Sequence, residues 1–84
     1  MTGTNHVIPL LLEMCAAIDT AFVEETGPFG QMLCADARAA WIATGNKLKP
    51  ADVVGYVRLL AAEIDEPARR AAFVARALAL IGMR

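Results

Sequence analysis

The chain has 84 residues, of which 57% are apolar and 20% are charged, and its formal net charge is −1. A chain of this length forms a single domain, and its high apolar fraction argues against a disordered protein. Because the charge balance is slightly acidic, no overall positive field attracts nucleic acid.

The first predicted helix covers residues 8–25, because Pro9 is tolerated only in the first turn of a helix. Residues 1–5 are expected to be frayed, at the start of one helical domain that covers residues 1–84. The spacing of the large apolar residues predicts a core face made of Leu11, Met14, Cys15, Ile18, Ala21 and Phe22. A second stripe lies beside Asp19 and contains Leu12, Ala16 and Val23. We expect another helix to cover it partly; the alternative is the edge of an interface.

The second predicted helix covers residues 28–44, between the break at Gly27-Pro28 and the pair Gly45-Asn46, which suits a left-handed C-cap. One face of this helix combines Phe29, Leu33, Ala37, Ala40, Trp41 and Thr44. Trp41 is the only tryptophan, and we expect it to anchor the core. The alternative is a contact at a protein interface, where Trp is over-represented.

The third predicted helix covers residues 50–64 and begins at Pro50. Its apolar stripe predicts that Val53, Val57, Leu60, Ala61 and Ile64 are buried. Tyr56 falls outside this stripe, on a mixed flank with Leu59 and Glu63.

The fourth predicted helix covers residues 66–82, with Pro67 in its first turn and Gly82 at its end. Large apolar residues cover about half of its circumference: Phe73, Val74, Leu78, Leu80 and Ile81. Beside them runs a stripe of small residues, Ala68, Ala72, Ala75 and Ala79, flanked by Arg69 and Arg76. We expect this stripe to pair with a second copy; the alternative is that the first helix covers it.

Together the four helices predict an all-α fold, a small four-helix bundle built from two helical hairpins. The candidate interface of this bundle consists of Trp41, Ala68, Arg69, Ala72, Ala75, Arg76 and Ala79. Dimerisation would supplement the modest core of a short chain.

Charge is unevenly distributed along the sequence. All eight Lys and Arg residues lie at or after Arg38, whereas the part before it is acidic. The simplest interpretation is charge complementarity between antiparallel helices of one chain. The alternative is an acidic face for a basic partner, formed by Glu13, Asp19, Glu24 and Glu25.

The sequence offers little that could carry out catalysis. It has no serine, one histidine (His6) and two cysteines, Cys15 and Cys34, without metal-ligand spacing. A Cys–His pair is conceivable, but we expect both cysteines to be small apolar core residues that face each other across the first two helices. We therefore predict a protein that is not an enzyme, with no cofactor, no metal and no small-molecule substrate.

No secretory signal or membrane-spanning stretch is evident, so a cytoplasmic protein with reduced thiols is expected. The abundance of Ala and the excess of Arg over Lys suggest a bacterial or phage genome.

These features predict a small protein-interaction module: an adaptor, a chaperone-like subunit or an inhibitor of a larger complex. One alternative is a helix-turn-helix DNA-binding regulator that uses Arg69, Arg70 and Arg76. It is disfavoured, because the recognition helix would be apolar over most of its face. A second alternative is a phage or plasmid inhibitor that presents the acidic first helix to a basic surface.

Overall fold

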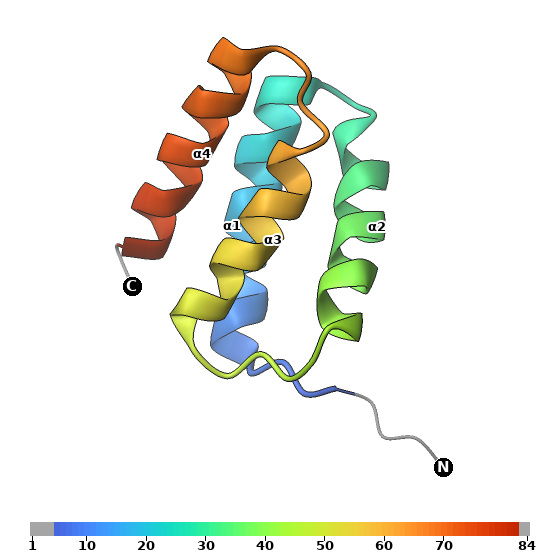
Figure 1. The fold of residues 1–84 in the computed structure, drawn as a ribbon, viewed down its shortest axis with the longest axis vertical. Coiled ribbons are helices and arrows are strands. Elements are labelled where there is room, and N and C mark those ends of the chain that lie inside the picture. The colour runs from blue at the N-terminus through green and yellow to red at the C-terminus, as the bar shows by residue number, and fades with distance from the viewer. Residues whose placement is uncertain (1–4, 83–84) are drawn as a thin grey trace.

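The computed structural model describes residues 5–82 and contains four α-helices that form a small bundle (Figure 1). The elements are α1 (Pro9–Thr26), α2 (Gly30–Ala43), the short 3₁₀ helix η1 (Pro50–Asp52), α3 (Val53–Ala61) and α4 (Pro67–Gly82). The predicted all-α fold is therefore confirmed. The boundaries differ by a few residues, since α2 begins after Pro28 and α3 ends three residues before Ile64.

The helices run alternately up and down the bundle (Figure 1). α2 packs on α1 and α3, and so does α4. α2 and α4 lie on opposite sides of the α1–α3 pair. Both outer helices therefore keep long flanks that no other described helix covers.

Two glycines determine how α2 starts. Gly27 has a φ of 85°, which favours glycine, and its N–H closes the end of α1 by donating to the carbonyl of Val23. A Cβ on Gly30 would lie 2.4 Å from Oγ1 of Thr26 and 3.2 Å from Cα of Val23. Glycine at position 30 therefore lets the first turn of α2 lie directly against the last turn of α1.

The core lies between all four helices and contains the whole predicted α1 stripe, from Leu11 to Phe22. The rings of Phe22 and Phe73 meet edge to face at 5.3 Å, and those of Trp41 and Tyr56 are 5.5 Å apart. The predicted α3 stripe is buried as well, and Tyr56, from the mixed flank beside it, is fully buried too. Only Tyr56 of that flank is enclosed, between α1 and α2, whereas Leu59 and Glu63 are exposed.

The prediction of which face of α2 is buried was wrong. Phe29, Ala40 and Thr44 are exposed, and Leu33 is only half-buried. The buried strip instead consists of Gly30, Cys34, Ala37 and Trp41. Two contacts set this rotation of α2. Gly30 brings one end of the helix against α1, and Nε1 of Trp41 near the other end donates a hydrogen bond to the carbonyl of Asp52 at 2.9 Å.

Exposure also decides two alternatives left by the sequence. Leu12 is 39% exposed and Ala16 is exposed, whereas Val23 is half-buried beside Gly30 of α2, so the described helices cover this stripe only in part, at its C-terminal end. On α4, the four alanines of the small-residue stripe, Ala68, Ala72, Ala75 and Ala79, are all exposed. α1 therefore does not cover them, because α4 turns Phe73 and Ala77 into the core instead.

The segment before α1 is held by the loop after α2. The backbone N–H of Lys47 donates to the carbonyl of His6 at 2.7 Å, and that of Ile8 donates to the carbonyl of Lys47 at 3.2 Å. The side chain of Asn5 donates to the carbonyl of Ile42 at 2.7 Å. Asn5 is therefore bound and not frayed as predicted; the rest of that prediction, residues 1–4, lies outside the described residues.

Candidate functional site

A groove of about 850 Å³ lies between α1 and α2. We call it the α1–α2 groove. Its α1 wall combines one apolar residue with three polar ones, and its α2 wall consists mainly of apolar and small side chains. The lining residues are Asp19, Thr20, Val23, Glu24, Gln31, Cys34, Ala35, Arg38, Ala39 and Ile42.

A polar cluster from three helices lies at the base of this groove. Asp19 on α1 accepts a hydrogen bond from Nη2 of Arg38 on α2, and the two form an ion pair. The other oxygen of Asp19 accepts a hydrogen bond from the hydroxyl of Tyr56 on α3. The guanidinium of Arg38 also lies over the ring of Tyr56, 5.5 Å from its centroid. One carboxylate thus joins three helices.

The cluster keeps its hydrogen-bond donors protonated at neutral pH. Burial, together with the bond to Asp19, raises the pKa of Tyr56 far above its ordinary value. Burial lowers the pKa of Arg38, but the Asp19 carboxylate and the Tyr56 hydroxyl raise it by more. Nε of Arg38 is buried and has no hydrogen-bond partner among residues 5–82. The guanidinium therefore has donor capacity beyond its bond to Asp19.

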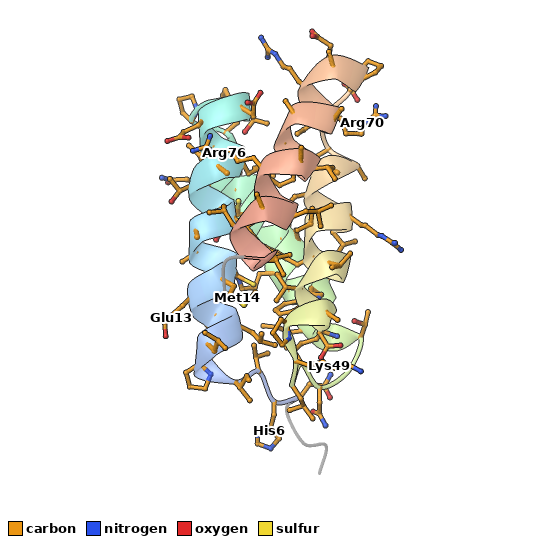
Figure 2. All side chains as sticks on the ribbon, turned by 90° about the vertical axis from the view of Figure 1, so that its left-hand side faces the viewer. His6, Glu13, Met14, Lys49, Arg70 and Arg76 are labelled. Carbon is orange, nitrogen blue, oxygen red and sulfur yellow. The ribbon has the colours of Figure 1, made fainter. Side chains whose placement is uncertain are left out.

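The two cysteines are buried, unpaired thiols in α1 and α2. Burial raises the pKa of Cys15 to about 11 and, reinforced by the nearby Asp19 carboxylate, raises that of Cys34 to about 12. Both are therefore protonated at neutral pH, when a thiol is a poor nucleophile. His6 is exposed and points away at the foot of the molecule (Figure 2), so the structure does not bring it to either thiol.

The four acidic residues predicted for a partner face do not form one surface. Asp19 is bound to Arg38 in the groove, and Glu24 pairs with Arg76 of α4. Glu13 points outward from the lower half of α1 (Figure 2), and Glu25 is half-buried near its end. The two ion pairs are the charge complementarity between helices that the sequence predicted.

The three arginines proposed for DNA binding are also used differently. Nε and Nη2 of Arg70 donate to the carbonyls of Ile64 and Asp65, at 2.9 and 3.1 Å. They thereby close the turn between α3 and α4. Figure 2 shows Arg70 and Arg76 on opposite sides of α4, so they do not converge on one face with the exposed Arg69.

Trp41 lies in the core, as its anchor interpretation predicted, so its ring is not part of the surface. Within the described part of the chain, no group of three or more His, Cys, Asp or Glu side chains could hold a metal ion. Between residues 5 and 82, no helix combines the length and apolar character that crossing a membrane requires.

Residues 13–84 match the family model "Domain of unknown function (DUF8082)". The chain belongs to this family. No curated protein and no solved structure shows a significant match. The family's description names no activity, so the function of this member has to be argued from the groove and the surfaces around it.

Sequence reasoning missed the groove, although part of its signal was present. The stripe of Leu12, Ala16 and Val23 continues its α1 wall, and Ala35, Ala39 and Ile42 recur at helical spacing along α2. What the sequence does not encode locally is the rotation of α2, which sends one flank of that helix toward α1. Tyr56 had no local signal at all, because its partner Asp19 lies 37 positions away.

Proposed function

We propose that this DUF8082 domain is a protein-interaction module that binds an amphipathic helix of another protein in the α1–α2 groove. It acts by surface binding and not by chemistry. The observation that carries the proposal is the groove itself, a concavity of about 850 Å³ whose exposed surface is mostly apolar, on an 84-residue chain. Binding an amphipathic helix between two helices is a recurrent mode of peptide recognition.

The dimensions of the groove suit a helix. Its α2 wall extends from Gln31 to Ile42, about three turns, or roughly 16 Å at 1.5 Å per residue. Ala35 and Ala39 keep this wall low, so the backbone of a third helix can approach closely. Such a helix would pack on the outer side of the α1–α2 hairpin, as α3 packs on the buried side of that hairpin.

The chemistry of the lining defines the partner. Val23 and Ile42 offer apolar contact to side chains of the docked helix at i, i+3 and i+4 spacing. Asp19 is already bound to Arg38 and Tyr56, so the base of the groove offers donors more than acceptors. A polar oxygen on the docked helix, such as a hydroxyl or an amide carbonyl, would bond to the guanidinium of Arg38.

The same residues support binding over catalysis. The thiol of Cys34 and the phenol of Tyr56 both have pKa values raised by burial, so neither serves as a base or nucleophile at neutral pH. Whether the partner makes the domain an adaptor, a chaperone-like subunit or an inhibitor depends on that partner's identity. A cytoplasmic location in a bacterial cell accords with two reduced, buried thiols.

The test is affinity capture from cells of the source organism with wild type and an Ala39→Arg variant. Ala39 is exposed on the groove wall, so Arg at this position fills the groove without disturbing the core. The matched control is Ala62→Arg, at another exposed alanine, outside the groove. We expect a partner that wild type and the control capture and that Ala39→Arg loses. A partner set that is identical for all three proteins would refute docking in the groove.

Self-association is a second proposal, supported by the exposed alanines on α4. Besides the four of the stripe, Ala71 and Leu78 are exposed on the same side, so this outward face is apolar over most of its length. A face of this kind is self-complementary and suits a homodimer with a two-fold axis.

A further inference from the structure

A second, smaller hollow lies on the other flank of α2. It has a volume of about 210 Å³ and lies between α2 and α3. Its apolar part is formed by Leu33, Ala37, Ala40 and Leu59, and its polar part by Asp36 and Glu63. No residue lines both this hollow and the α1–α2 groove, so the two are distinct surfaces.

Apolar side chains are unusually exposed around this hollow. Phe29 is 77% exposed and precedes Leu33 by one helical turn, on the same side of α2. Met32 is 68% exposed at the same end of the helix, and Leu59 on α3 is 38% exposed. Large apolar side chains that are exposed around one hollow indicate an interaction site more than singly scattered surface residues do. We call the hollow and Phe29 the α2–α3 face.

The two carboxylates of the α2–α3 face differ from Asp19 and Glu24 on α1. Asp19 and Glu24 are each bound to an arginine. Asp36 and Glu63 are exposed, and neither forms an ion pair within residues 5–82. Arg38 follows Asp36 by two positions but is bound to Asp19 in the α1–α2 groove, and Arg58, five positions before Glu63, does not line the hollow.

From this juxtaposition we infer that the α2–α3 face binds a basic amphipathic helix of a partner protein. A large apolar side chain of that helix enters the hollow between Leu33 and Leu59. Lysine or arginine side chains one turn to either side pair with Asp36 and Glu63. The charge complementarity selects the partner and speeds its association, while the apolar contact supplies most of the affinity. The acidic rim repels nucleic acid and anionic lipid.

The experiment uses two synthetic peptides with the same helical pattern of leucines. One has lysine at every polar position, and the other has glutamate. Titration of the full chain at low and high salt, followed by backbone amide NMR shifts and calorimetry, gives both the affinity and the location of binding. We expect the lysine peptide to bind, with shifts centred on Leu33, Ala40 and Leu59. We expect its affinity to fall with salt, and the glutamate peptide to bind at least tenfold more weakly.

Charge reversal tests whether the two named carboxylates are responsible. Asp36→Lys with Glu63→Lys should lower the affinity for the lysine peptide about tenfold and raise the affinity for the glutamate peptide. Glu13→Lys with Glu25→Lys changes the net charge equally on α1, at two residues that do not line the hollow, and should alter both affinities less than twofold. The inference is overturned by any of three results: the lysine peptide does not bind, the two double variants weaken it equally, or the shifts lie in the α1–α2 groove.

Discussion

The hydroxyl of Tyr56 on α3 donates a hydrogen bond to the carboxylate of Asp19 on α1, across 37 positions of the chain. Since the same carboxylate binds Arg38 of α2, a single side chain sets the relative positions of three helices. The apolar contacts around it would tolerate small rotations of these helices, but a shared carboxylate with two fixed donors does not. This cluster also forms the base of the α1–α2 groove.

We predict that Tyr56→Phe lowers the free energy of unfolding by about 1–2 kcal/mol, the usual cost of losing one buried hydrogen bond to a charged group. The ring remains to pack against Trp41, and Asp19 keeps its ion pair with Arg38. Urea denaturation measures the change. A loss below about 0.3 kcal/mol would show that the hydroxyl contributes nothing to the bundle.

Asp19→Asn should cost more than Tyr56→Phe, about 2–3 kcal/mol, because it leaves a partly buried Arg38 without its counter-charge. The double variant should lose less than the sum of the single variants, since both act on one network. The matched control is Glu24→Gln, which removes an ion pair whose side chains are both about half exposed, and it should cost under about 1 kcal/mol. Strict additivity of Asp19→Asn and Tyr56→Phe would contradict the network.

The positions of the helices could be predicted from the sequence because local signals mark them. Pro67 stands at the first residue of α4, and Gly27 closes α1. On α1 the six apolar positions of the predicted stripe are the six buried ones. That helix packs against three others, so the periodicity of its apolar residues translates directly into burial.

The candidate sites could not be predicted in the same way. α2 is Ala-rich on several faces, so its apolar pattern does not determine which face is buried. Gly30 and the bond from Trp41 to Asp52 determine that rotation, and both depend on the partner helices. Both concavities lie on flanks of α2, so the same rotation places both candidate surfaces.

The raised pKa values of the two thiols predict a loss of stability in alkali. In the unfolded chain a thiol with a pKa near 9 loses its proton above that pH, whereas the folded chain retains it up to about 11 at Cys15 and about 12 at Cys34. Above pH 9 the unfolded state therefore binds fewer protons than the folded state. The contribution of the two thiols to the free energy of unfolding is complete below pH 9 and falls as the pH rises above it. Urea denaturation between pH 7.5 and 9.5 measures this fall.

The control for the alkaline loss is the variant with Cys15→Ala and Cys34→Ala. It should be less stable than wild type at pH 7.5, because two core side chains are truncated, but its stability should change less with pH. In wild type, a thiol reagent should react slowly in native buffer and quickly in denaturant. Parallel pH profiles for the two proteins, or fast labelling of the native chain, would contradict protonated, buried thiols.

Arg70 and Arg69 form a natural matched pair on α4. Arg70→Met should destabilise the fold by about 1 kcal/mol, because the carbonyls of Ile64 and Asp65 lose its two hydrogen bonds. Arg69→Met, at an exposed neighbour, should change stability by less than about 0.5 kcal/mol. Neither variant should alter duplex DNA binding, which we expect to be undetectable at physiological salt. Equal effects of the two variants on stability would show that the turn does not depend on Arg70.

The apolar outward face of α4 predicts self-association that one substitution abolishes. Ala68, Ala72, Ala75 and Ala79 leave a flat surface on which a second copy of α4 can approach to the short end of the usual 8–10 Å range. Arg76 and its partner Glu24 lie beside this surface, so the edge of the seam carries both signs of charge. Light scattering should therefore show a dimer at high protein concentration, and Ala75→Glu should convert it to a monomer.

Because Ala75 is exposed in the single chain, Ala75→Glu should leave helicity and the stability of the monomer nearly unchanged. Unfolding by this substitution would instead mean that the chain buries position 75. Ala62→Glu serves as the control, since it adds the same charge at an exposed alanine directly after α3 and should leave the dimer intact. A wild type that stays monomeric at millimolar concentration would eliminate the pairing of α4. The α1–α2 groove and the α2–α3 face would then be the remaining surfaces for a partner.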